Sequence, residues 1–296
     1  MDKRKYLNPE IVAKLSNMSL RARLVVEGYL IGQHRSPYHG FSVEFAEHRA
    51  YGPGDEIRHI DWKLYGKTDR YYIKRFEEET NLRSHILLDT SKSMTYSSGK
   101  TSKLEYGSYL AAALSYLMLK QRDGIGMILF DEKINHFIPP RSTSTHVNII
   151  LHHLDILVSG ADTKIQPVLD EMAERIKKRG LIILISDLLD EPDSIMSGLR
   201  HFRHNGQEII VFHILDRQEL EFEFSSRMRF KDLESGETVT TEPWQIRSSY
   251  RKVMKQFQAN YQRNCRSQRI DYIPLFTDYP LDRALNEYLN KRQKLG

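Results

Sequence analysis

Short, near-continuous apolar runs alternate with longer segments of helical periodicity from residue 84 to the end of the chain. Five runs have the length and continuity of buried parallel strands: residues 84–89, 126–130, 181–187, 208–215 and 270–276. Between and after them, apolar positions recur at helical spacing, which predicts helices over 104–122, 145–157, 166–178, 192–203, 243–264 and 281–292. Because strands that alternate with helices form a parallel sheet covered on both faces, the pattern predicts an α/β, doubly wound, mostly parallel fold.

The first 80 residues have a different pattern of apolar, polar and glycine positions. Apolar positions at helical spacing, after the start signal Asn8-Pro9-Glu10, predict a helix over 8–32. Glycines then punctuate short aromatic and polar segments, which indicates loops and short strands. Further along, alternating residues around Ser235-Gly236 predict a hairpin. We therefore expect an N-terminal helix-plus-short-strand extension, residues 1–80, and an α/β domain, residues 81–296, with a β-hairpin insertion near 220–241.

The composition is that of an ordinary globular protein, since 28% of the 296 residues are charged and 40% are hydrophobic. The formal net charge is +5, but acidic and basic residues are interleaved, which favours solvated faces over a nucleic-acid surface. The single cysteine, Cys265, excludes an internal disulfide framework and fits a reducing compartment. No secretory signal pattern and no bilayer-long apolar stretch is visible. We therefore expect a cytoplasmic protein without a membrane span.

Oxygen-bearing side chains gather where two of the predicted strands end. The run Ile86–Met94 reads I-L-L-D-T-S-K-S-M, so Asp89 ends an apolar strand and hydroxyls follow at Ser91 and Ser93. Asp187 ends a second apolar run, and the carboxyl ends of parallel strands share one edge of a sheet, where open α/β folds hold ligands. Carboxylate and hydroxyl oxygens suit a hard cation such as Mg²⁺. The pattern indicates a binding site rather than a catalytic one, because no activated nucleophile or poised base accompanies it.

A third hydroxyl lies in a predicted loop between two helices, in the sequence Gly160-Ala161-Asp162-Thr163. With it, the order D-x-S-x-S, a distant threonine and a strand-terminal aspartate closely resembles the metal-ion-dependent adhesion site of von Willebrand factor A domains. The resemblance implies a von Willebrand factor A or Rossmann-like fold. It also implies Mg²⁺ or Mn²⁺ held, directly or through water, by Asp89, Ser91, Ser93, Thr163 and Asp187. The alternative is that Ser91 and Ser93 only cap a turn or a helix.

Motifs between residues 32 and 74 make the resemblance more specific, because they point to one protein family. They are Gly32-Gln33-His34-Arg35-Ser36, Gly40-Phe41-Ser42-Val43-Glu44-Phe45, Arg49-Ala50-Tyr51, Gly54-Asp55, Arg58-His59-Ile60-Asp61-Trp62-Lys63 and Tyr72-Ile73-Lys74. This segment is similar to the bacterial domain-of-unknown-function fifty-eight family, whose members join it to a von Willebrand factor A-like core. The resemblance implies an adaptor or chaperone-like partner of a MoxR-type AAA+ ATPase. Because few formal charges surround the expected ion, it should accept a carboxylate of the partner protein.

Charged and aromatic residues of the same segment have two interpretations. They contact the partner, or they form a partly buried polar network that fixes a glycine-rich connection. For each charged residue singly, a structural salt bridge is the favoured interpretation. The residues are Arg35, Glu44, Arg49, Asp55, Arg58, Asp61, Trp62 and Lys63.

Two other classes of protein stay open. Asp89 followed by Thr90 is similar to the nucleophile position of haloacid-dehalogenase-type phosphoryl-transfer enzymes, but these need a second aspartate where this chain has Ser91. Without that proton donor, an enzyme is the less favoured interpretation. Basic residues from Arg247 onward, interleaved with aromatics such as Tyr250, are compatible with nucleic-acid binding. Core packing with a solvated face explains them better, so we expect a protein partner and no nucleic acid.

Overall fold

The computed structural model describes residues 8–33, 48–50, 52, 62–74, 82–160, 164–231 and 236–295. The chain forms two compact units, one of Met1–Pro37 with Leu82–Gly296 and one of Tyr38–Asn81. The larger unit contains a six-stranded sheet, and the smaller one contains a two-stranded ribbon of its own.

Six strands form the sheet of the larger unit, in the spatial order β10-β7-β6-β3-β4-β5. They are β3 (Arg83–Asp89), β4 (Gly124–Phe130), β5 (Ile134–Arg141), β6 (Leu181–Ser186), β7 (Glu208–Leu215) and β10 (Asp271–Phe276). All neighbouring pairs are parallel except β4 with β5, an antiparallel pair that places β5 at one edge. The chain runs outward from β3 on one side and from β6 on the other, so the strand order reverses between β3 and β6. The predicted α/β, mostly parallel fold is confirmed.

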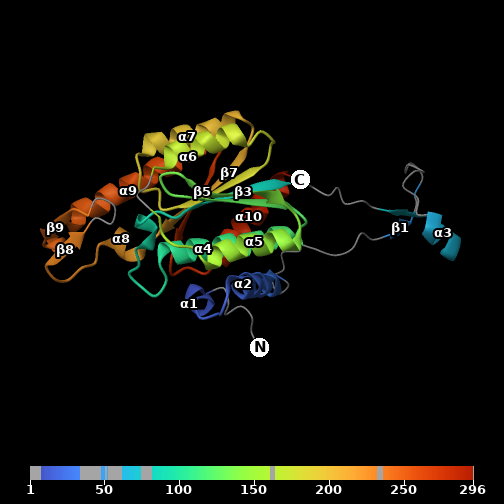
Figure 1. Ribbon diagram of the computed structural model, residues 1–296, viewed down its shortest axis with the longest axis horizontal. Coiled ribbons are helices and arrows are strands. Elements are labelled where there is room, and N and C mark those ends of the chain that lie inside the picture. Colours follow the sequence, from blue (N-terminus) through green and yellow to red (C-terminus); the bar gives the residue numbers. More distant parts are fainter. Residues whose placement is uncertain are drawn as a thin grey trace. The chain divides into compact units, whose positions relative to one another are not determined.

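Helices cover both faces of this sheet (Figure 1). One face carries α6 (Ile165–Arg175), α7 (Pro192–His204) and part of α9 (Pro243–Ser267). The other carries α4 (Lys103–Lys120) and α5 (Ser144–Asp155), with α10 (Asp282–Leu295) beside α4. The central strands β3, β4 and β6 are buried on both faces, which explains their near-continuous apolar runs.

The N-terminal helices pack on the larger unit. The helix expected over 8–32 is two helices, α1 (Pro9–Val12) and α2 (Met18–Gln33), because the chain turns between them. Arg21 stabilises this turn by donating hydrogen bonds to two of its carbonyls. α2 packs against α4. The larger unit thus includes residues 8–33, whereas the expected N-terminal extension comprises residues 1–80.

The described part of the smaller unit contains two short strands and one helix. β1 (His48–Ala50) pairs antiparallel with β2 (Tyr72–Lys74), and α3 (Trp62–Thr68) lies between them in the chain. The stacked rings of Tyr65 and Tyr71, with centroids 4.5 Å apart, join α3 to the residue before β2. Short strands agree with the sequence pattern, but α3 was not predicted, because the glycine within it lowers helix propensity.

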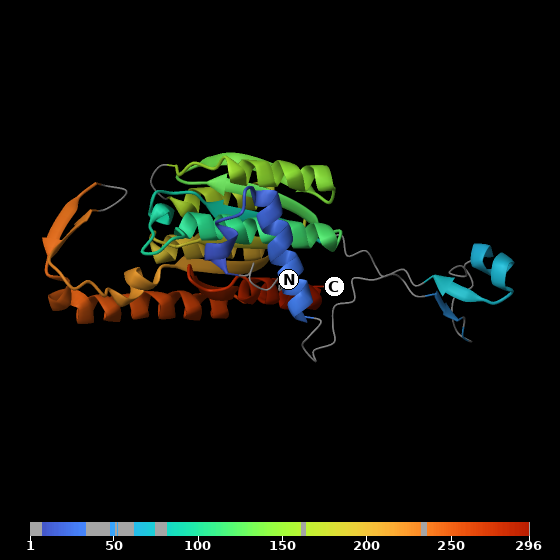
Figure 2. The same ribbon diagram turned by 90° about the horizontal axis from the view of Figure 1, so that it is seen from below.

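Between β7 and β10 the chain leaves the sheet. This excursion comprises α8 (Arg217–Glu221), a hairpin of β8 (Met228–Lys231) and β9 (Thr238–Thr241), and the first half of α9. Figure 2 shows the hairpin beside the N-terminal end of α9, beyond the end of the sheet. The rings of Phe222, Phe230 and Tyr250 stack there and form a small separate core. The structure therefore contains a hairpin within the segment where the sequence predicts one.

Candidate metal centre

Asp89 lies at the carboxyl end of β3, where the strand order reverses, and its side chain is fully buried. Open α/β sheets bind ligands at such a place because the connections after the two central strands diverge there. Asp89 Oδ1 accepts a hydrogen bond from the backbone N–H of Ser91 over 2.9 Å. Asp89 Oδ2 accepts one from Ser186 Oγ, at the end of β6, over 2.7 Å. The carboxyl group is thereby fixed between the two central strands.

The loop after β3 turns tightly beside that carboxyl group. Thr90 is held to the end of β4, because its N–H and its hydroxyl donate to the carbonyl of Phe130 over 2.7 and 2.8 Å. A 3₁₀ turn, η3 (Ser93–Thr95), follows. The Oγ atoms of Ser91 and Ser93 lie 3.1 Å apart, and both side chains are buried. The structure therefore brings three of the five predicted ligands, Asp89, Ser91 and Ser93, into one loop.

Asp187 follows β6 and is almost fully buried. Its Oδ2 accepts a hydrogen bond from the ammonium group of Lys103, with Nζ 2.8 Å away. Lys103 Nζ also donates to Glu219 of α8 over 2.9 Å. The main-chain carbonyl of Asp187 lies 2.9 Å from Nε2 of His213 on β7. The fourth predicted ligand thus lies at the expected edge of the sheet, but an internal cation lies against it.

Sequence reasoning missed Lys103 and Glu219. Lys103 is the first residue of α4, and a lysine at the start of a helix is ordinarily exposed. One signal could have found it: Lys103 precedes Tyr106 and Leu110 at helical spacing, so it falls on the buried stripe of α4. No comparable signal marks Glu219, because its pairing depends on where α8 lies in the folded chain.

The charges at this edge act differently on two buried groups. Burial, together with the charge of Asp187, raises the pKa of Asp89 from 3.8 to about 7, although hydrogen bonds from its neighbours lower it. Burial alone would lower the pKa of the Lys103 ammonium group, but the carboxylates of Asp187 and Glu219 outweigh it and raise that pKa. Lys103 therefore stays protonated, and Asp89 is a buried carboxyl group that a nearby cation would stabilise in its charged form.

The donor set of Asp89, Ser91 and Ser93 fits a hard divalent cation. All three side chains offer oxygen, the ligand atom that Mg²⁺ prefers. Adjacent ligands of an octahedral Mg²⁺ ion lie about 2.9 Å apart, close to the 3.1 Å between the two serine oxygens. Within the described ranges, no group of three or more His, Cys, Asp or Glu side chains could hold a metal ion, so hydroxyl ligands are essential to this candidate. Thr163, the fifth predicted ligand, lies outside the described residues.

The loop that leads to Thr163 can be followed as far as Gly160. The Gly160 N–H donates to the carbonyl of Thr90 over 2.7 Å, which holds this loop against the one that follows β3. A Cβ at position 160 would stand 2.8 Å from Cγ of Asp131 and closer still to its carboxylate oxygen. The absence of a side chain at Gly160 therefore permits the close approach of this loop to Asp131, in the turn after β4.

The N-terminal residues expected to contact a partner or to form a polar network are mostly not described. Arg35, Glu44, Asp55, Arg58 and Asp61 lie outside the described residues, as do the side chains of Arg49 and Lys63. Trp62, the first residue of α3, is exposed, and its ring packs edge-on against that of Tyr65. The network stays a prediction.

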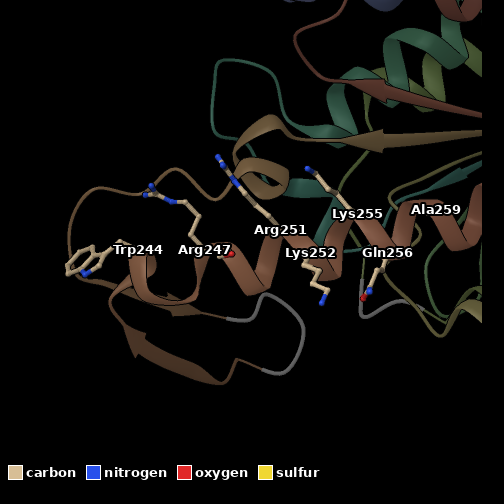
Figure 3. Close-up of a pocket in the computed structure, with 8 residues that line it drawn as sticks. Trp244, Arg247, Arg251, Lys252, Lys255, Gln256 and Ala259 are labelled. Carbon is tan, nitrogen blue, oxygen red and sulfur yellow. The ribbon is translucent and has the colours of Figure 1, made fainter.

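The basic residues of α9 border an open groove of about 650 Å³, and Figure 3 shows Arg247, Arg251 and Lys255 along it. Arg247 donates to two main-chain carbonyls of the segment after α8, over 3.0 and 2.7 Å. Arg251 donates to the carbonyl of the last residue of α8. Because two of these guanidinium groups bind the chain itself, the groove favours structural pairing and a solvated face over a nucleic-acid surface.

The topology and this edge define a class of protein, a doubly wound α/β domain with oxygen donors at the carboxyl ends of its central strands. In fold, the chain is similar to the crystal structure of an aerotolerance-related membrane protein from Bacteroides fragilis NCTC 9343, with a TM-score of 0.51 and 18% identity over 71% of this chain and 99% of that chain. It also matches the VWA domain of SpRpn10, with a TM-score of 0.38 and 12% identity over 70% of this chain and 95% of that chain.

The chain belongs to the family described as "Protein of unknown function DUF58", whose profile matches residues 47–260. The family predicted from the N-terminal motifs is thereby confirmed. Uncharacterized proteins of Mycobacterium tuberculosis and Mycobacterium bovis are 24% identical over 234 residues, which cover 77% of this chain and 73% of each relative. Among the described residues, no helix has both the length and the apolar character needed to cross a bilayer.

Proposed function

We propose that this protein is a non-enzymatic protein-interaction module whose binding depends on Mg²⁺, with Mn²⁺ as the alternative ion. The observation that carries the proposal is the buried cluster of Asp89, Ser91 and Ser93 at the point where the strand order reverses. The cluster lies where α/β sheets hold ligands, and its side chains offer the oxygen atoms that a hard divalent cation prefers. The von Willebrand factor A-like fold, typical of protein-interaction modules, supports the interaction role.

Each residue of the proposed site has a distinct part. Asp89 supplies a charged oxygen, and two hydrogen bonds hold its carboxyl group in orientation. Ser91 and Ser93 supply neutral oxygens, and Thr163 and Asp187 complete the set directly or through water. When bound, the ion supplies a coordination position for a carboxylate oxygen of a partner protein. Hydroxyl oxygens neutralise none of the ion's charge, so this donor set favours a carboxylate that comes from outside.

The contacts of Asp89 support a binding role over a catalytic one. Its side-chain oxygens accept hydrogen bonds from Ser91 and Ser186, and position 91 has no carboxylic acid to protonate a leaving group. A phosphoryl-transfer enzyme that uses Asp89 is therefore the weaker alternative. Turnover of a generic phosphate ester that Asp89→Asn abolishes would establish it.

We also propose that the protein acts in the cytoplasm as an adaptor or chaperone-like partner of a MoxR-type AAA+ ATPase. This part rests on membership of the DUF58 family and not on a contact in the structure. Its test is therefore separate from the test of the metal site.

Calorimetric titration of the metal-stripped protein with Mg²⁺, and separately with Mn²⁺, tests the site. We expect about one ion per wild-type chain and no binding by Ser91→Ala/Ser93→Ala. Ser98→Ala, which changes an exposed serine of the same loop, is the matched control and should bind like the wild type. Far-UV circular dichroism separates loss of ligands from loss of fold. A folded double variant that binds Mg²⁺ as the wild type does would refute the site.

A pull-down with the MoxR-type ATPase of the same organism, in Mg²⁺ and in EDTA, tests the partner. Capture that requires both Mg²⁺ and the two serines supports the whole proposal. Capture that EDTA leaves unchanged supports the adaptor role and removes the metal from it. Absence of capture in either buffer contradicts the ATPase as partner.

A further inference from the structure

Lys103 places a positive charge inside the molecule, next to the candidate site. Its side chain is 0% exposed, and its Nζ lies 2.8 Å from Asp187 and 2.9 Å from Glu219. The Asp187 side chain is 2% exposed and that of Glu219 is 23% exposed, so an inner and an outer carboxylate share the ammonium group. The ring of Tyr96 lies beside it, with its centroid 5.7 Å from Nζ.

The position of this lysine is unfavourable for the helix that carries it. Lys103 is the first residue of α4, where the positive end of the helix dipole repels a cation. Burial of an ammonium group also removes its hydration, at a cost that only anionic partners offset. The two carboxylates therefore explain why a lysine is found here, and helix stability does not.

A count of charges shows what Lys103 does at this edge. Asp89, Asp187 and Glu219 contribute three negative charges when they are ionised, the buried Asp131 and Asp216 after β4 and β7 add two more, and Lys103 contributes one positive charge. That charge pairs with Asp187, whereas Asp89 accepts its hydrogen bonds from neutral donors. A divalent cation at the Asp89 cluster and the ammonium group are both attracted to Asp187, and they repel each other.

We propose that Lys103 is an internal counter-ion that sets the metal affinity of this edge. It neutralises Asp187 in the metal-free protein, and it weakens the binding of a divalent cation beside that carboxylate. The proposal rests on the proposed function for the location of the ion. Glu219 moderates the effect, because it attracts the ammonium group away from Asp187, toward the more exposed side. Loss of Lys103 and loss of Glu219 should therefore change the metal affinity in opposite directions.

Mg²⁺ titration calorimetry on Lys103→Met and Glu219→Gln tests this role. Methionine resembles lysine in length without its charge, so we expect Lys103→Met to bind Mg²⁺ about tenfold more tightly than the wild type, or more. Its melting temperature should fall below that of the wild type without Mg²⁺ and recover when Mg²⁺ is added. Glu219→Gln should bind Mg²⁺ about threefold more weakly, or weaker still.

Lys100→Met is the matched control. Lys100 is an exposed residue of the same loop and pairs with Glu10, so its substitution removes the same charge at the surface. Because solvent screens that charge, Lys100→Met should bind Mg²⁺ like the wild type. If it binds as tightly as Lys103→Met, net charge and not the buried pair sets the affinity, which overturns the proposal.

The other outcomes separate this inference from the proposed function. Binding by Lys103→Met but not by the wild type supports the counter-ion and contradicts Mg²⁺ dependence of the wild-type protein. Equal binding by the wild type, Lys103→Met and Glu219→Gln refutes the counter-ion and leaves the metal site intact. Absence of binding by every folded protein of the set overturns both. If Lys103→Met does not fold even in Mg²⁺, Glu219→Gln decides, because unchanged or tighter binding by it refutes the counter-ion.

Discussion

His85 should make the stability of the fold depend on pH in a specific way. It lies on β3, is 5% exposed, and its Nδ1 has no hydrogen-bond partner within the described part of the chain. Burial, with the charge of Arg83 beside it, lowers the pKa of His85 from 6.5 to about 4. The folded protein therefore keeps this ring neutral at pH values where the unfolded chain protonates it.

The sign and the size follow from proton linkage. Between pH 6.5 and about 4 the unfolded state binds more protons, so the free energy of unfolding falls as the pH falls. The slope approaches about 1.4 kcal/mol per pH unit between the two pKa values, which amounts to about 2 kcal/mol from neutral pH down to about pH 4.5. His85→Leu removes the titrating ring, so its stability relative to the wild type should rise by about 2 kcal/mol over this range.

Urea denaturation followed by far-UV circular dichroism, at several pH values from neutral to about pH 4.5, measures this difference. Subtraction of the two proteins at each pH cancels the contributions of other groups, such as His213, whose pKa burial also lowers to about 4. His204→Leu, at the exposed end of α7, controls for the loss of a histidine as such. If the stabilities of the wild type and His85→Leu fall in parallel, His85 does not stay neutral in the folded state and the reasoning is wrong.

Two further substitutions test the contacts that shape the candidate site. Ser186→Ala leaves Asp89 Oδ2 without its donor and should lower the free energy of unfolding by about 1–3 kcal/mol in urea. Ser115→Ala, whose hydroxyl donates to a carbonyl of its own helix, should change the free energy of unfolding much less, and equal losses in the two variants would contradict this prediction. Gly160→Ala should destabilise by about 1–3 kcal/mol, because the new methyl group collides with a buried carboxylate. Gly99→Ala is the control, because there is open space around Gly99. Equal melting temperatures of the two glycine variants would contradict this prediction.

The sheet and part of the site could be predicted from local sequence. Strands buried on both faces leave few polar positions, so their apolar runs were visible without any tertiary information. Asp89, Ser91 and Ser93 lie within one tight loop, which keeps them together once the strand is placed. Lys103 falls on the apolar stripe of α4, but its partners could not be predicted from nearby residues, because Asp187 lies 84 and Glu219 116 residues further along the chain. A lysine without such a distant partner would be exposed.

The packing of the N-terminal region was harder to predict, because it also depends on residues far away in the chain. α2 has a buried stripe that includes Met18, Ala22, Val25 and Tyr29, but an apolar stripe does not specify which surface covers it. In the structure that surface is α4, which follows the second unit in the chain. The expected boundary at residue 80 follows the order of the chain, whereas the contacts in the structure group α2 with the α/β domain.

α9 is one helix of 25 residues whose halves have different surroundings. Tyr261 and Cys265 are fully buried in the core, whereas the N-terminal half stands beside the hairpin, beyond the sheet (Figure 2). A rigid helix converts a tilt at its buried end into a displacement that grows with its length. At 1.5 Å per residue, about 27 Å separates Tyr261 from Pro243, so a tilt of about 10° at the root moves the tip by about 5 Å. Such a tilt would displace the hairpin together with the N-terminal half of α9, and a spectroscopic label on the hairpin would report it.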